Sequence, residues 1–189
     1  MTIKPDSWIR KMALEQDMIT PFEEGIKRPG KISYGLSSYG YDIRLACNFL
    51  VMRSPYDFPE DTLVDPKDFN KDLFMHEWGD YCIIPPNSFV LASSYEHITV
   101  PNDVMVVCLG KSTYARCGIV IGITPLEPAW SGHITIEISN TTPYPAKVYA
   151  MEGIAQLLFY QSDTPCDISY ADKKGKYQNQ QTIVMPKVD

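Results

Sequence analysis

The chain has 189 residues, 44% of them hydrophobic and 21% charged, which is the composition of an ordinary soluble globular protein. A formal net charge of −6 argues against non-specific binding to a nucleic-acid backbone, and the N-terminus lacks the apolar run of a secretory signal. No stretch is long enough to span a membrane. The five cysteines form no C-x-x-C pair, a pattern typical of reduced, mostly buried thiols in a reducing compartment. We therefore expect one cytoplasmic domain over residues 1–189, with no nucleic-acid or membrane partner.

The first predicted element is a short amphipathic helix over residues 6–18. Its apolar side chains recur at roughly helical intervals, and Asp6 or Ser7 is suited to cap its start. Thr20-Pro21 interrupts the pattern, so the helix is expected to end before it.

From Ser38 onward the pattern changes to short β-branched or aromatic runs separated by Pro, Gly and Asn. Tyr39 to Leu45 alternates between apolar and polar residues, and the next apolar run reaches Met52. Residues 53–70, here called the excursion loop, are rich in Pro and Asp and are predicted to be a long loop. Further strands are expected over residues 81–84, 88–95, 104–109, 119–123, 133–139, 146–150 and 154–160. With almost no helix between them, these strands indicate a mainly β barrel or sandwich with short peripheral helices.

A segment of mixed polar and basic residues, GKSTYARCG, joins two predicted strands at residues 110–118. Ser112 is a good N-cap and Gly118 suits a helix C-terminus, so one or two helical turns fit here. The N–H groups at the start of such a turn, with the donors of Lys111 and its neighbours, would form an anion cradle with Arg116 on the same face. From the pattern alone, a capped connecting turn with two solvated basic residues is the simpler interpretation.

The run HITIEISN at residues 133–140 alternates strictly between apolar and polar side chains. Its three isoleucines share one face of the predicted strand, whereas Thr135, Glu137 and Ser139 share the other. If the polar face lies in solvent, which is the commoner case, Glu137 is an ordinary surface residue. If that face lines a pocket, partial desolvation raises the pKa of Glu137 towards the value that a proton shuttle needs.

Residues 124–132 predict a rigid chain reversal, because two prolines flank Glu127 and a Ser-Gly pair follows the apolar anchor Trp130. This segment is either a well-built hairpin loop or a wall that presses against a sugar. The later stretch from Tyr170 to Gln181 is polar, locally basic and almost free of aliphatic residues. Alone it would be predicted as a disordered end, although its lysines and amides are suited to fold over a phosphate chain.

Several motifs of cofactor-dependent and nucleophilic enzymes are missing from the sequence. None of the three histidines lies in the H-x-E pattern of a zinc-binding signature, and no two cysteines have metal-ligand spacing. The sequence also lacks the P-loop, the Rossmann glycine fingerprint and the G-x-S-x-G elbow of serine hydrolases. We therefore expect no zinc held by protein ligands.

Four segments, in this order, resemble the bacterial dCTP deaminases, a family within the superfamily of trimeric dUTP pyrophosphatases. They are GYDIRL at 40–45, KSTYARCG at 111–118, EPAWSGHITIEISN at 127–140 and GKYQNQQ at 175–181. The resemblance implies a distorted β-barrel or jelly-roll of the trimeric dUTP pyrophosphatase type and a homotrimer with sites between subunits. It also implies hydrolysis of dCTP to dUTP and ammonia, supplying dUTP for dUMP and thymidylate synthesis.

The resemblance assigns the role of general acid/base to Glu137, acting on a water held by Ser112 and Arg116. A C-terminal tail of about residues 170–189 would close over the substrate, Mg²⁺ would arrive chelated by the triphosphate, and dTTP is a candidate inhibitor. The implied substrate-binding residues are Lys111, Ser112, Thr113, Tyr114, Ala115, Arg116, Glu127, Thr135, Ile136, Glu137, Gln156, Tyr170, Lys176 and Gln180. Two alternatives stay open: a bifunctional enzyme that also releases dUMP and pyrophosphate, and a trimeric β-barrel that binds nucleotides without turnover.

Overall fold

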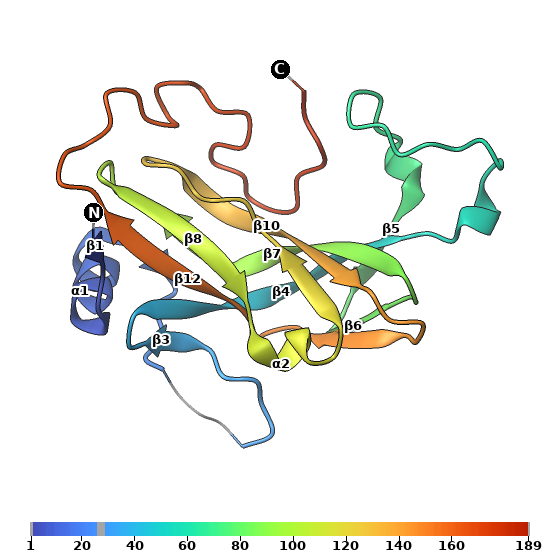
Figure 1. Ribbon diagram of the computed structural model, residues 1–189, viewed down its shortest axis with the longest axis horizontal. Helices are drawn as coiled ribbons and strands as arrows, with labels where there is room; N and C mark the ends of the chain where they lie inside the picture. The colour runs from blue at the N-terminus through green and yellow to red at the C-terminus, as the bar shows by residue number, and fades with distance from the viewer. Residues whose placement is uncertain (1, 26–28, 189) are drawn as a thin grey trace.

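The computed structural model of the chain describes residues 2–25 and 29–188 (Figure 1). In this part of the chain the elements are, in order, β1 (Thr2–Ile3), α1 (Asp6–Gln16), β2 (Ile19–Thr20), β3 (Gly35–Ser37), β4 (Gly40–Met52), η1 (Pro55–Asp57), η2 (Lys71–Leu73), β5 (Phe74–Trp78), β6 (Tyr81–Ile84), β7 (Ser88–Thr99), β8 (Val104–Gly110), α2 (Ser112–Ala115), β9 (Ile119–Gly122), β10 (Ser131–Asn140), β11 (Ala146–Tyr149) and β12 (Gly153–Gln161). The mainly β fold with short peripheral helices that the sequence predicts is confirmed.

One strongly curled sheet forms most of the molecule (Figure 1). Its main path runs β1-β12-β4-β7-β10-β9, while β2, β3, β5 and β8 pair with strands on that path. Strands β11 and β6 form a second, two-stranded sheet. The main core fills the inside of the curl and includes Tyr41, Phe49 and Phe159, each at most 1% exposed.

The strands predicted between residues 81 and 160 are all present, as is the loop predicted over 53–70. The two predicted runs up to Met52 form the single strand β4, whose first half pairs with β3 and β12 and whose second half pairs with β5 and β7. Four strands were not predicted, namely β1, β2, β3 and β5. Most are two or three residues long and owe their conformation to a partner strand rather than to a periodic pattern.

Helix α1 begins at Asp6 as predicted, but neither Asp6 nor Ser7 is its N-cap. Pro5 holds that position without a side-chain hydrogen bond, while the Asp6 carboxylate accepts the Ser7 N–H at 2.7 Å. The helix ends at Gln16, slightly earlier than predicted, because Asp17 adopts a left-handed conformation with φ 51°.

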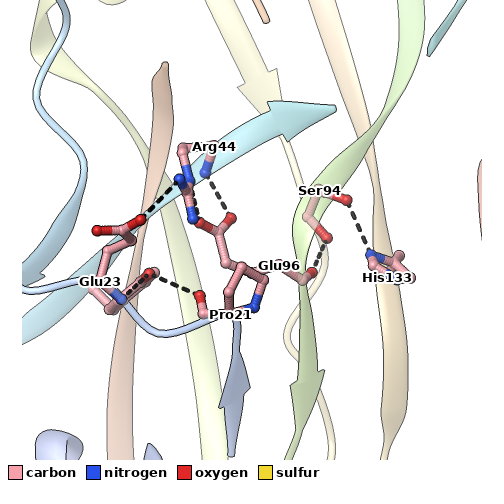
Figure 2. Close-up of polar contacts among 7 residues, drawn as sticks. Pro21, Glu23, Arg44, Ser94, Glu96 and His133 are labelled. Carbon is pink, nitrogen blue, oxygen red and sulfur yellow. Dashed lines mark hydrogen bonds and ion pairs between the residues drawn. The ribbon is translucent and has the colours of Figure 1, made fainter. Parts of the chain in front are cut away.

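The strand β7 has a bulge where it pairs with β10, and close to it Glu96 of β7 forms a buried ion pair with Arg44 of β4. Figure 2 shows the ion pair. The β7–β10 register shifts between His133 and Thr135, and there the Ser94 hydroxyl accepts the Ile134 N–H at 2.8 Å. Behind this bulge Glu96, which is fully buried, accepts hydrogen bonds from the Arg44 backbone N–H at 2.8 Å and from Arg44 Nε at 2.6 Å. Bulges increase local twist, which is consistent with the curl of the sheet.

A second, smaller apolar cluster lies on the outer face of the sheet, outside the main core. We call it the outer cluster. Its buried members come from β4, η2, β5 and β7, and the residues packed against them come from β4, the excursion loop, β7 and the C-terminal tail: Leu50, Leu73, Phe74 and Leu91, with Met52, Phe58, Phe69, Phe89, Ile183 and Met185. Two irregular segments far apart in sequence thus meet on one sheet face.

The sequence also led to expectations about the cysteines and about the cellular location. All five cysteines are free thiols, but only Cys82 is buried, whereas Cys117 and Cys166 are exposed, so the prediction of mostly buried thiols is wrong. Within residues 2–25 and 29–188, no helix has both the length and the apolar character needed to cross a membrane. The expected cytoplasmic location stays a prediction.

Candidate active site

A cavity of about 770 Å³ lies against the outer face of β7 and β10. One wall is the sheet itself, with Leu91, Thr135 and Glu137; another is the loop from Ile123 to Trp130. The excursion loop contributes Val64, Pro66 and Phe69, and the C-terminal tail contributes residues between Tyr170 and Pro186. Most of this lining is apolar, and Glu137 is a carboxylate within it.

Glu137 owes its place in the cavity to the alternation of β10. Ile134, Ile136 and Ile138 are each at most 2% exposed and point into the main core, so the side chain of Glu137 must point to the other face. Water reaches the carboxylate, but the cavity walls displace much of the surrounding solvent. This desolvation raises the pKa of Glu137, and a hydrogen bond from its own backbone N–H opposes the shift only in part.

The neighbours of Glu137 in the sheet leave space in front of it. On one side its Cα partner is Leu91 of β7, and on the other it is Gly122 of β9. A Cβ atom at Gly122 would lie 3.4 Å from Glu137 Cβ and 3.8 Å from Oε2. The absence of a side chain at this position therefore keeps one flank of the carboxylate open.

The C-terminal tail is ordered along β10, unlike the disordered end that its composition alone predicts. The His133 N–H donates to the Gln180 carbonyl at 2.9 Å, and Gln180 Nε2 donates to the His133 carbonyl at 2.6 Å. Trp130 Nε1 donates to the Tyr177 carbonyl at 3.0 Å. The contact is close because Gly132 has no side chain: a Cβ there would lie 2.9 Å from the Gln180 carbonyl oxygen. Residues of the tail thus form one wall of the cavity.

Polar contacts also join the start of the tail to the loop that precedes β10. The Tyr170 N–H donates to the Pro128 carbonyl at 3.0 Å, and the Tyr170 hydroxyl accepts the Tyr177 N–H at 3.0 Å. Glu127, predicted to contact substrate, lines the cavity but is ion-paired with Lys173 at 2.8 Å. These contacts give the cavity a rigid rim on the side of the 124–132 loop.

The segment at 110–118 forms the predicted short helix, α2, but at the edge of the molecule opposite the tail (Figure 1). Gly118 ends the turn with φ 71°, as predicted, whereas Lys111 rather than Ser112 is the N-cap residue. Ser112, Thr113, Ala115 and Arg116 are exposed, and Arg116 Nη1 donates to the Ser112 carbonyl at 3.0 Å. No residue of 111–116 lines the cavity that holds Glu137.

Three further predicted binding residues have side chains committed elsewhere. Lys111 Nζ lies 2.6 Å from Asp42 Oδ2 and 3.2 Å from Ser33 Oγ. Gln156 is next to this pair and donates to Ser37 Oγ at 2.9 Å. The side chain of Tyr114 is buried, and its hydroxyl accepts the Tyr149 N–H at 3.1 Å.

The structure therefore divides the predicted site residues into two groups. Glu127, Thr135, Glu137, Tyr170, Lys176 and Gln180 line the cavity. Lys111, Ser112, Thr113, Tyr114, Ala115, Arg116 and Gln156 lie away from it, and the side chain of Ile136 is buried in the core. Sequence reasoning missed the apolar wall made by Phe69, Phe89 and Leu91, as well as Asp42, although Asp42 lies within the GYDIRL segment.

Among residues 2–25 and 29–188, no three His, Cys, Asp or Glu side chains are grouped so that they could hold a metal ion. Around Glu137 the cavity offers one further carboxylate, that of Glu127, which is already paired with Lys173. The donor set does not fit a protein-held zinc, which requires three or four nitrogen, sulfur or oxygen ligands.

Comparison with known proteins shows the family of the chain. The sequence model of the dCTP deaminase-like family matches residues 3–162. Proteins named dCTP deaminase are similar over their whole length: that of Chlamydia pneumoniae is 56% identical, covering 98% of this chain and 99% of its own, and that of Chloroflexus aurantiacus is 57% identical, covering 100% of both.

A solved structure supports the fold independently. The crystal structure of 2′-deoxycytidine 5′-triphosphate deaminase from Agrobacterium tumefaciens matches with a TM-score of 0.61 at 18% identity. The match covers 85% of this chain, which spans about half (48%) of that longer protein. At this identity the likeness concerns the fold alone. On the strength of the family match and the full-length relatives, the chain belongs to the dCTP deaminase-like family of enzymes.

Proposed function

We propose that the chain hydrolyses dCTP to dUTP and ammonia, with Glu137 as the general acid/base. One observation carries the proposal: Glu137 projects into a large, mostly apolar cavity whose walls raise its pKa although its side chain remains partly exposed to water, and residues of the tail form one wall of that cavity. A carboxylate with a raised pKa is suited to take up and return protons near neutral pH. Full-length relatives named dCTP deaminase support the same reaction.

In the proposed reaction, Glu137 takes a proton from the attacking water as its oxygen adds to C4 of cytosine. The carboxyl group gives this proton to the ring nitrogen, then takes the second proton from the new C4 hydroxyl and passes it to the amino group. The C–N bond breaks as C4 becomes a carbonyl and ammonia leaves. Gln180 would hold the nucleotide: the residue lines the cavity, and its buried Oε1 has no hydrogen-bond partner among the described residues. Thr135, Glu127, Tyr170 and Lys176 line the same cavity and would contact the base and sugar.

Ser112 and Arg116 are proposed to complete the site from a neighbouring subunit of a homotrimer. In one chain these residues are exposed and lie outside the cavity of Glu137. A site formed between two copies would bring the exposed α2 residues of one copy to the cavity of the next. There they would hold the attacking water, stabilise charge at C4 and, with Lys111 and Gln156, bind the phosphate side of the nucleotide.

Mg²⁺ is proposed to enter with the triphosphate, as part of the substrate. The described residues contain no cluster of ligands that could hold a metal ion, and the proposal includes no step on a metal bound by the protein. EDTA is expected to inhibit by removing Mg²⁺ from the nucleotide, and Mg²⁺ without zinc is expected to restore activity.

The deciding experiment is incubation of the purified protein with dCTP and Mg²⁺, followed by product analysis. Ammonia and dUTP support the proposal, whereas dUMP and pyrophosphate indicate the bifunctional enzyme. Tight binding of dCTP or dTTP without any product would indicate a nucleotide sensor instead. Adding dTTP to an active sample tests the proposed inhibition, because dTTP shares the sugar and triphosphate with the substrate.

A further inference from the structure

The excursion loop contributes little to the main fold. Its neck is closed where the Arg53 N–H donates to the Leu73 carbonyl at 2.8 Å, and nearly all of its side chains project into solvent. Only Phe58 and Phe69, among residues 53–70, are partly buried. Both belong to the outer cluster. The loop therefore touches the rest of the molecule chiefly through two aromatic rings.

These rings pack on the sheet face that carries Glu137. The ring centroids of Phe69 and Phe74 are 5.9 Å apart, and those of Phe74 and Phe89 are 5.5 Å apart in an edge-to-face arrangement. The next member, Leu91, is the Cα partner of Glu137 across the β7–β10 ladder. A continuous apolar path thus runs from the excursion loop to the residue beside the proposed acid/base.

The end of the tail lies on the same path. Residues 183–185 are partly buried, although the flanking Thr182 and Pro186 are exposed, and the side chains of Ile183 and Met185 pack in the outer cluster. Two hydrogen bonds fix the register: Asn48 Nδ2 donates to Thr182 Oγ1 at 2.9 Å, and the Val184 N–H donates to Thr135 Oγ1 at 3.1 Å.

We propose that the excursion loop is a binding surface for the C-terminal tail, with Phe58 and Phe69 holding Ile183 and Met185 against the sheet. Apart from the three-residue helix η1, neither segment has regular structure to offset the entropy of ordering it, so the apolar area that the two bury in the outer cluster contributes to ordering both. The anchored end holds the preceding tail residues, including Gln180, over the cavity. Phe69 is therefore a positioning residue for tail closure. Only the catalytic consequence rests on the proposed function, since the anchor consists of the chain's own side chains.

Hydrogen–deuterium exchange on the full-length, ligand-free protein tests the anchor directly. Phe69→Ala is compared with Tyr56→Ala, a control in the same loop whose side chain is 96% exposed. In Phe69→Ala we expect the peptide covering residues 182–188 to exchange about tenfold faster, because its bound state loses an aromatic contact. The peptide covering 133–140 should be unchanged, and the control should match the wild type in both.

The same variants are assayed for deamination of dCTP across pH. Loosening the tail lets more water surround Glu137 and lowers its pKa, so Phe69→Ala should lower kcat/KM about tenfold and shift its acid limb to lower pH. Faster tail exchange in a preparation whose wild type makes no dUTP would contradict the proposed function and leave the anchor standing. If Phe69→Ala also speeds exchange in the 133–140 peptide, Met185→Ser, which alters only the tail, decides. The proposal is overturned if the 182–188 peptide of the deciding variant exchanges at the wild-type rate. That variant is Phe69→Ala, or Met185→Ser if Phe69→Ala disturbs the 133–140 peptide.

Discussion

The strand β10 and the segment around α2 carry the two halves of the proposed site. Within one chain, the half on β10 is surrounded by other segments, whereas the half on α2 is exposed. Around Glu137 the chain supplies sheet, loop and tail, and the tail is held in place by hydrogen bonds to His133 and Trp130. Around α2 the side chains of Ser112 and Arg116 are exposed, and Lys111 is engaged by Asp42.

This difference is the one that the proposed site between two subunits would require. Desolvation, which raises the pKa of a carboxyl group, requires walls that displace water, and a single chain builds such walls around Glu137 from its own segments. Charge stabilisation by Arg116 requires only a positioned donor, which a neighbouring copy can present on a short exposed turn. Under the proposed function, two chains are needed for one reaction. Each prediction below tests one side of this contrast, from the largest expected effect to the smallest.

Glu137→Gln should have the largest effect, because the amide keeps the size of the side chain but cannot take up a proton. We expect kcat for dCTP deamination to fall about 10³-fold, with little change in KM, since general acid/base groups contribute in this range. Ammonia release measures the rate. Glu60→Gln, an exposed carboxylate of the excursion loop, serves as the control and should behave as wild type. Full activity in Glu137→Gln would remove this residue from the mechanism.

Mixing inactive variants should restore activity if the two groups of residues come from different chains. Arg116→Ala and Glu137→Gln are each expected to be inactive alone. Random assembly of the two in a cyclic trimer leaves about one quarter of the sites with both native residues, so about a quarter of wild-type activity should return. A mixture of Arg116→Ala with Ser112→Ala, which alters the same half of the site, should stay inactive. Failure of the first mixture to recover would place the whole site within one chain.

Variants of Lys111 and Asp42 test whether Lys111 binds phosphate or serves only in a structural ion pair. If its ammonium group leaves Asp42 to bind the triphosphate, Lys111→Met should raise KM for dCTP about tenfold while kcat changes little. Asp42→Asn removes the ion pair but keeps the lysine, so its KM should stay near the wild-type value. Equal KM increases in both variants would show instead that the Lys111–Asp42 pair acts through structure. Steady-state kinetics with both proteins, together with their melting temperatures, separates these outcomes.

Much of the fold and part of the site could be predicted from local sequence patterns. Alternation along residues 133–140 predicted both the strand β10 and the shared face of Thr135 and Glu137, because side-chain direction in a strand follows from spacing alone. Local patterns do not report which distant segments meet. Leu91 and Phe69 form the wall near Glu137 only after the sheet curls and the excursion loop folds back.

The same limit explains the errors at the polar residues. Asp42 and Lys111 are far apart in sequence, and nothing near Lys111 indicates that a carboxylate will meet it. The predicted Ser112 cap fails for a related reason. The N-cap conformation belongs to Lys111, whose backbone is fixed by its hydrogen bond to the Ile154 carbonyl on β12. A tertiary contact overrides the local capping preference there.

The smallest expected effect concerns His97, which is connected through Ser131 of β10 to the tail that lines the cavity of Glu137. Its Nε2 is 3.4 Å from Ser131 Oγ, and the Ser131 N–H donates to Gln178 of the tail. Burial, and then the nearby His133, lower the pKa of His97 below its ordinary 6.5. A histidine with a lowered folded-state pKa stabilises the protein above the unfolded pKa, and this contribution is lost as pH falls below about 6.5.

We therefore expect the melting temperature of the wild type to fall more between pH 7.5 and pH 5.5 than that of His97→Gln, by about 1–3 °C. His76→Gln alters an exposed histidine on β5 and should follow the wild type at both pH values. Because the tail is hydrogen-bonded to β10 here, the Gln178–Gln180 amides of the wild type should exchange faster at pH 5.5 than at pH 7.5. This increase in exchange rate should be smaller in His97→Gln. A pH response that is identical in all three proteins would place the sensitivity elsewhere, on groups that do not support the tail.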